Sequence, residues 1–183
     1  MPPVAATPSL IEAPPLVATQ LDTPVGEMIA VADDRALHLL EFHDRTALAG
    51  EMRRIERRLG PVATGSTAIL DAVARELAEY FAGERTAFSL PIAQRGTPFT
   101  SAVWAALCEI PCGETRSYGQ LAAHLGRPSA VRAVARANGA NQVAILVPCH
   151  RVIGADGTLV GYGGKLWRKQ WLLDHERRLD RLF

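Results

Sequence analysis

Residues 117–138 read SYGQLAAHLGRPSAVRAVARAN and contain two short helical patterns that are separated by a turn. Ser117 and Gln120 have the spacing of a capping box, which predicts that a helix begins at this point. Gly126 then interrupts the pattern, and a second helix is predicted over residues 128–138. A short helix, a glycine-containing turn and a second helix are typical of a helix-turn-helix. We therefore expect a compact domain that presents its second helix to a partner.

The second of these helices has a distinctive composition. Arg132 and Arg136 lie one turn apart, and the residues between them, including Ala133 and Ala135, are small. Small side chains let a helix approach a DNA duplex closely, and two arginines on one face suit phosphate or groove contacts. An alanine-rich packing helix with two solvated arginines explains the same residues equally well, so both interpretations stay open on this segment alone.

Cys149 lies in a short run, PCHRV, that follows the second helix. Most cysteines in folded proteins act as small apolar side chains. A cysteine becomes a nucleophile when a base or a positive charge stabilises its thiolate, and His150 and Arg151 are next to it in the sequence. A nucleophile close to a DNA-reading helix indicates chemistry on a base, which normally requires that the base leave the stack. Arg132 could then fill the vacated space.

The first half of the chain alternates between strand and helix patterns. Met28–Val31 and Ala36–Phe42 are two apolar strands that flank a turn, which predicts a hairpin. Amphipathic helices are predicted over residues 45–59 and 67–81. The first of these helices carries a run of arginines, at positions 53, 54, 57 and 58. They could touch phosphate, although a solvated helix face is the more ordinary interpretation.

The composition limits the possible classes of protein. The chain has 183 residues, of which 48% are hydrophobic and 21% charged, and a net charge of +1. This near-neutral charge does not by itself indicate a nucleic-acid-binding protein. Three cysteines argue against a disulfide framework and for a reducing compartment. No apolar run reaches about 18 residues and no signal peptide is present, so we expect a cytoplasmic protein without membrane association.

The pattern along the chain predicts three regions. Residues 1–18 are rich in proline and alanine and are interpreted as a flexible tail. Residues 19–93 form the α/β unit, and residues 94–183 form a mainly helical unit that contains the helix-turn-helix. The first half contains no cysteine, so we expect neither zinc there nor any other metal in the protein.

The stretch from Thr97 to Glu176 resembles the C-terminal domain of the O6-alkylguanine-DNA alkyltransferases, the methylated-DNA–protein-cysteine methyltransferases. The segments that carry the resemblance are Ile110–Thr115, Ser117-Tyr118, Arg132–Val134, Asn141, Pro148–Val152, Gly161-Tyr162 and Leu172–Glu176. Residues 22–92 resemble the family's N-terminal domain. The resemblance implies a ribonuclease-H-like α/β N-terminal domain and a mainly α C-terminal domain with a winged-helix-like helix-turn-helix.

The resemblance also implies a role for each residue around the cysteine. Cys149 would accept the alkyl group, and His150 would remove the thiol proton through a water molecule. Glu176 would hold and polarise His150, which is the logic of a catalytic triad with a thiol nucleophile. Asn141 would brace the turn between the recognition helix and the strand that carries the nucleophile. Tyr118 would press on the phosphate 3′ of the target and donate a proton to guanine.

The partner implied by the resemblance is double-stranded DNA that contains O6-alkylguanine, bound through its minor groove. Arg132 would be the intercalating finger. The other residues expected at the DNA are Tyr118, Arg136, Ala133, Ala135 and Asn138, and those expected at the guanine are Tyr162, Gly163, Gly164 and Val152. The thioether product has no easy route back, so each molecule would act once, as a monomer, without a cofactor or an obligate protein partner.

Two other functions compete with this interpretation. A non-enzymatic protein that binds alkylated lesions would keep the fold but lack the nucleophile, and the presence of Cys149 argues against it. A Cys-His hydrolase would regenerate its thiol and turn over more than once per molecule, and it leaves Arg132 unexplained. The number of events per molecule distinguishes the hydrolase from the alkyltransferase.

Overall fold

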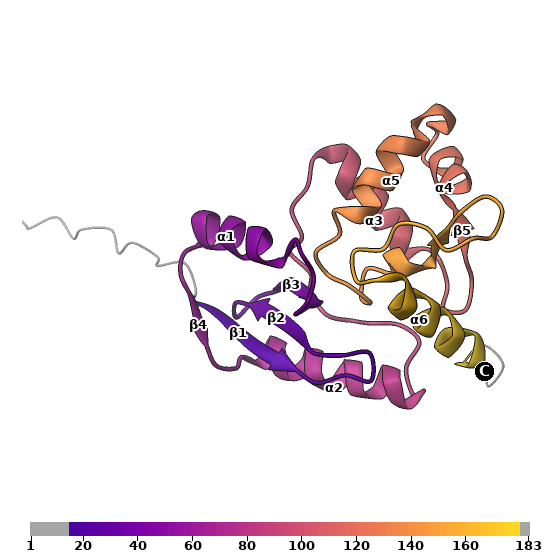
Figure 1. Ribbon diagram of the computed structural model, residues 1–183. Helices are drawn as coiled ribbons and strands as arrows, with labels where there is room; N and C mark the ends of the chain where they lie inside the picture. The colour runs from indigo at the N-terminus through magenta and orange to yellow at the C-terminus, as the bar shows by residue number, and fades with distance from the viewer. Residues whose placement is uncertain (1–14, 180–183) are drawn as a thin grey trace, which may run out of the picture.

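A four-stranded sheet forms the centre of the N-terminal half in the computed structural model, which describes residues 15–179 (Figure 1). Its strands are β1 (Leu16–Leu21), β2 (Met28–Ala32), β3 (Leu37–Phe42) and β4 (Val62–Thr64). The strand order is β3-β2-β1-β4, with β1, β2 and β3 antiparallel and β4 parallel to β1. The predicted hairpin corresponds to β2 and β3.

Helices cover both faces of this sheet. Helix α1 (Leu48–Leu59) lies on one face, where Ile55 packs with Val31 and Leu39 in a small apolar cluster. Helix α2 (Ala68–Ala82) lies on the opposite face and contributes to a larger core (Figure 1). Because successive side chains of a strand point to opposite faces, the apolar strands β2 and β3 can supply both clusters at once.

The C-terminal half is mainly helical, as predicted. Its helices are α3 (Pro98–Cys108), α4 (Tyr118–His124), α5 (Val131–Gly139) and α6 (Leu166–Leu179), with 3-10 turns η1 (Pro128–Ala130) and η2 (Cys149–Arg151) and two paired short strands, β5 (Arg116–Ser117) and β6 (Val152–Ile153). The capping box is confirmed, because Ser117 Oγ accepts from Gln120 N at 3.1 Å and Gln120 Oε1 accepts from Ser117 N at 2.7 Å. Helices α4 and α5 form the helix-turn-helix around Gly126, whose φ is 67°.

The two halves share one hydrophobic core. Phe42 and Tyr80 from the N-terminal half are in the same buried cluster as Leu107, Leu121 and Leu172 from the C-terminal half. Strand β3 also forms single parallel bridges to two later segments, Leu37 to Ile92 and Leu40 to Val143. The N-terminal sheet is therefore packed directly against the segment that leads to Cys149.

Three expectations need correction. The tail was predicted to extend to residue 18, but β1 begins at Leu16, and the rest of the predicted tail, residues 1–14, lies outside the described residues. The helix predicted from residue 128 begins with a 3-10 turn, and the α-helix starts at Val131. Cys149 lies in a 3-10 turn, not on a strand. Within residues 15–179, no helix is long and apolar enough to cross a membrane.

Candidate active site

Cys149 lies at the first position of η2, where its side chain is buried and held by Asn141. Asn141 Nδ2 lies 3.1 Å from Cys149 Sγ and also donates to the Val147 carbonyl at 2.8 Å, so one amide fixes both the thiol and the preceding turn. Burial raises the pKa of Cys149 to about 11, although the Asn141 hydrogen bond opposes the rise. The thiol is therefore protonated at neutral pH and needs a base to react.

His150 and Glu176 form a fully buried pair beside the nucleophile turn. His150 Nε2 lies 2.8 Å from Glu176 Oε1. Because a carboxylate can only accept, Nε2 carries the proton and Nδ1 carries the lone pair. Nδ1 is buried and has no hydrogen-bond partner among the described residues. His150 Nδ1 can therefore accept one hydrogen bond through its lone pair, and His150 is next in sequence to the cysteine.

Glu176 is held from both halves of the protein. Arg151 donates to it through Nε at 2.8 Å and Nη2 at 2.9 Å, and the Tyr80 hydroxyl of α2 donates at 2.9 Å. Burial alone would raise the pKa of Glu176, but the charges and hydrogen bonds of His150 and Arg151 outweigh it and hold the pKa well below its usual range. Glu176 therefore stays ionised and can stabilise a positive charge on His150.

A small cavity of about 10 Å³ adjoins Cys149. It is bounded by Glu41, Arg45, Asn138, Gly139, Ala144, Cys149, Gly161, Tyr162, Gly163 and Gly164. The Tyr162 hydroxyl is buried and has no partner among the described residues. A Cβ added to Gly164 would lie 2.6 Å from the Phe42 ring, so only glycine fits there. The cavity has room for about one water molecule.

Tyr118 and the two arginines of α5 lie on the helix-turn-helix, as expected from the sequence. Tyr118 is the first residue of α4, and its hydroxyl lies 3.3 Å from the Val160 carbonyl and 3.4 Å from that of Gly161. This contact brings Tyr118 to the glycine-rich loop that borders Cys149. Arg132 and Arg136 are exposed on α5, and Ala133 and Ala135 between them are partly buried.

Asn138 does not fit its expected place on the DNA-facing surface. It is only 2% exposed, and its Nδ2 donates to the Cys149 carbonyl at 3.3 Å. The last turn of α5 therefore packs onto the nucleophile turn, and Asn138 belongs to the interior wall of the cavity. Val152 is also buried, and its carbonyl accepts from Lys169 Nζ at 2.5 Å.

Arg45 is the residue at the site that sequence reasoning missed. It is almost buried and pairs with Glu41, and its Nη2 lies 3.3 Å from Glu51 Oε1. The same guanidinium donates to the Asn141 carbonyl at 3.1 Å and to the Gly139 carbonyl at 2.9 Å. Arg45 and Asn141 are 96 positions apart, so no local pattern could indicate the contact.

A buried thiol beside a histidine–glutamate pair, directly behind a helix-turn-helix, defines a DNA-binding protein with cysteine chemistry. The similarity of the chain to known protein families agrees with this class. Residues 16–94 match the model of the 6-O-methylguanine DNA methyltransferase, ribonuclease-like domain, and residues 98–178 match that of its DNA binding domain. The chain belongs to the methylated-DNA–protein-cysteine methyltransferase family.

Relatives match over most of the chain. The methylated-DNA–protein-cysteine methyltransferase of Salmonella typhimurium is 45% identical over 166 residues, which cover 88% of this chain and 95% of that relative. The constitutive enzyme of Bacillus subtilis is 46% identical, with 87% and 94% covered. The crystal structure of Mycobacterium tuberculosis OGT in complex with DNA superposes with a TM-score of 0.79 at 40% identity, with 89% and 94% covered.

Proposed function

We propose that this protein repairs alkylated DNA by taking the alkyl group from O6 of guanine onto Cys149, once per molecule. The observation that carries the proposal is the Cys149 thiol, fixed at 3.1 Å by Asn141 and adjacent to the buried His150–Glu176 pair. The named activity of the relatives, and the DNA bound to the Mycobacterium tuberculosis protein, support the same conclusion.

The first step is deprotonation of the thiol. No direct hydrogen bond joins His150 to Cys149 within residues 15–179, and His150 Nδ1 is unpartnered. A bridging water would accept the thiol proton and pass one of its own to Nδ1. The imidazolium formed in this way is stabilised by Glu176 at 2.8 Å.

The second step is a displacement at the alkyl carbon. The thiolate sulfur forms a bond to that carbon, the bond from the carbon to O6 breaks, and its electron pair remains on guanine. A proton donor must meet the developing charge. Burial raises the pKa of Tyr118, so its hydroxyl holds its proton at neutral pH and can donate to the guanine. The thioether is not a substrate for the reverse step, so the protein is consumed.

The target base must leave the duplex to reach Cys149. The cavity at Cys149 holds about 10 Å³, far less than a guanine, so the loop of residues 154–164 has to move when the base enters. Tyr162, Gly163, Gly164 and the carbonyl of Val152 then line the base. Arg132 fills the gap in the stack, while Arg136, Ala133 and Ala135 contact the minor groove.

We assign residues 94–183 to DNA binding and alkyl transfer and residues 19–93, extended by the start of β1, to the N-terminal domain. Cys108 and Cys149 form no disulfide within the described residues, which fits a reducing compartment such as the cytoplasm. Double-stranded DNA with an O6-alkylguanine lesion is the proposed partner, and the reaction needs no protein partner.

Intact-mass spectrometry after incubation with a duplex that contains O6-methylguanine tests the proposal. The wild type should gain the mass of one methyl group, located on Cys149 by peptide mapping, and the Cys149→Ser variant should gain none. Cys108→Ser is the matched control and should still be methylated, because Cys108 is exposed and lies outside the site. Lesion binding without a mass change would refute the transferase, and more than one event per molecule would indicate a hydrolase.

A further inference from the structure

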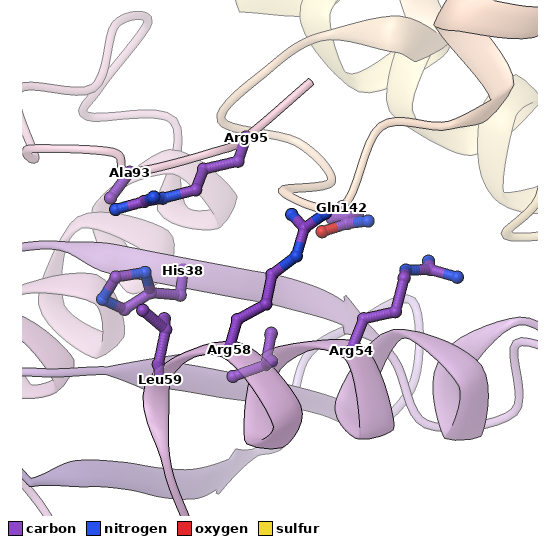
Figure 2. A pocket seen from close by; sticks show the side chains of 8 residues that line it. His38, Arg54, Arg58, Leu59, Ala93, Arg95 and Gln142 are labelled. Carbon is purple, nitrogen blue, oxygen red and sulfur yellow. The ribbon is translucent and has the colours of Figure 1, made fainter. Parts of the chain in front are cut away.

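A second cavity, of about 150 Å³, lies between α1 and the segment that joins the two halves (Figure 2). Its walls share no residue with the cavity at Cys149. Arg54 and Arg58 enter it from α1, Arg95 enters from the joining segment, and Gln142 borders it from the turn after α5. The cavity therefore collects polar groups from three separate parts of the chain.

The three arginines bring positive charge to a cavity whose lining contains no acidic side chain. No Asp or Glu side chain lines this cavity, and none of the three guanidinium groups forms an ion pair or hydrogen bond within residues 15–179. Glu51, outside the lining, is the acid on which the charge of Arg54 acts, and its Oε1 lies 3.3 Å from Arg45 Nη2. Like charges that are brought together in this way repel one another unless an anion lies between them.

The geometry suits an anion with several oxygens. Arg54 and Arg58 are one helical turn apart and rise from α1 into the cavity, which Gln142 also lines (Figure 2). Arg95 extends across the opposite wall above His38. Guanidinium groups present two parallel N–H donors that match the oxygens of a phosphate, which a single ammonium group cannot do.

The remaining lining also favours an anion over a cation or a purely apolar ligand. His38 is buried in the floor, and its Nε2 is bound to Asp33 at 2.9 Å, so this acid is already occupied. Ile55 and Leu59 of α1 form an apolar wall.

We propose that this cavity is a phosphate-binding site, formed by Arg54, Arg58, Arg95 and Gln142 and separate from the alkyl-transfer site. The ligand carries a phosphate group, supplied either by the backbone of bound DNA or by a free phosphate compound. Gln142 is adjacent to Asn141, which contacts Cys149 Sγ at 3.1 Å, so a bound phosphate lies one residue away from the support of the nucleophile.

The experiment compares two double variants of the full chain. Arg58→Gln/Arg95→Gln removes two guanidinium groups from the cavity, and Arg53→Gln/Arg57→Gln removes two from the same basic helix outside the cavity lining. Both lower the net charge equally. Because Arg58 and Arg95 are exposed and unpartnered within the described residues, the fold should be retained, and thermal unfolding checks this.

The first measurement is calorimetric titration with inorganic pyrophosphate at low salt. The wild type and the Arg53→Gln/Arg57→Gln control should bind, and the Arg58→Gln/Arg95→Gln variant should bind at least about tenfold more weakly, the loss expected for charge-assisted hydrogen bonds. Equal binding by the two variants, or no binding by the wild type, would overturn the site for free phosphate compounds.

The second measurement is the dependence of DNA affinity on salt, and this arm rests on the proposed DNA-binding function. If the DNA backbone supplies the phosphate, the slope of log K against log salt should fall by about 1 to 2 for the cavity variant, and less for the control. A pyrophosphate difference without a slope difference assigns the site to a free compound. If neither measurement separates the variants, the proposal is wrong, and methyl transfer to Cys149, tested separately, is unaffected by that result.

Discussion

Replacing Arg45 by alanine should destabilise the protein strongly, and more so at high pH. The guanidinium makes two hydrogen bonds to the segment before Cys149, to the carbonyls of Gly139 and Asn141, and it pairs with the buried Glu41 and Glu51. Loss of the two hydrogen bonds costs about 2 kcal/mol at about 1 kcal/mol each. Removal of one partner from a buried ion pair typically costs about 3–5 kcal/mol in total.

The pH dependence follows from Glu41. Burial raises its pKa to about 7, although Arg45 opposes the rise. In the unfolded chain the carboxyl has its ordinary pKa near 4.5, so between that pH and about 7 the folded protein binds the extra proton and loses stability as pH rises. Without Arg45 the folded pKa moves higher, and the loss of stability continues above pH 7. Each pH unit of this extension costs about 1.4 kcal/mol.

The free energy of unfolding should therefore fall in Arg45→Ala by about 2 kcal/mol at pH 6 and by about 4 kcal/mol at pH 9. Urea denaturation followed by circular dichroism at both pH values measures this difference. Arg75→Ala is the control, because Arg75 is exposed and its ion pair with Glu79 is long, at 3.9 Å. It should change the free energy of unfolding by less than about 1 kcal/mol at either pH. A deficit for Arg45→Ala that stays constant with pH would refute the role of Glu41, and one below about 1 kcal/mol would refute the role of Arg45.

Three further changes test the site. Glu176→Gln removes the carboxylate that accepts from His150 at 2.8 Å and should slow single-turnover methyl transfer by about 100-fold or more, while a rate within a few-fold of wild type would contradict the relay. Asn141→Ala should raise the pKa of Cys149 above its value of about 11. The thiolate absorbance, measured with Cys149→Ser as the background, should then rise at a higher pH than in the wild type, and a rise at a lower pH would contradict this expectation. Tyr80→Phe should lower the free energy of unfolding in urea by about 1 kcal/mol and leave methyl transfer nearly unchanged, because Glu176 keeps its other donors, and a large loss of rate would instead make Tyr80 part of the relay.

The parts of the fold that the sequence predicts are those with local causes. Ser117 and Gln120 define the start of α4 because both partners of the capping box lie within one turn. The apolar periods of α1 and α2 are visible in the sequence because each helix packs one face on the sheet. Strand β4 has only three residues, and its extended conformation is fixed by pairing with β1. The residues Val62–Thr64 alone therefore do not indicate a strand. The same holds for the start of β1 at Leu16, which follows two prolines.

The site shows a similar division. The short run around Cys149 indicates a nucleophile because its neighbours can ionise, and the resemblance adds Glu176. The burial of Asn138 depends on how α5 packs onto the turn at Cys149, which its own sequence does not specify. Arg45 could not be found at all, since its partners, the carbonyls of Gly139 and Asn141, are brought to it only by the packing of the two halves.

Two polar contacts join the N-terminal half to the residues around Cys149. Tyr80 of α2 donates to Glu176 at 2.9 Å, and Arg45 donates to the carbonyl of Asn141 at 3.1 Å. Each reaches a group that directly contacts either His150 or the thiol. The ribonuclease-like half therefore fixes the geometry of the nucleophile, even though the helix-turn-helix and the cysteine both belong to the other half.

The high pKa of Cys149 suits the single reaction that we propose for each molecule. A thiol with a pKa of about 11 is almost entirely protonated at neutral pH, and its burial keeps soluble electrophiles away from the sulfur. A thiolate that was exposed and already ionised would be alkylated by any small electrophile and wasted. His150 Nδ1 is unpartnered and makes no direct hydrogen bond to the sulfur within the described residues. The thiol can therefore stay protonated until a water molecule joins it to Nδ1 and the target base enters. The same burial that makes the thiol unreactive alone therefore makes its reaction selective for DNA.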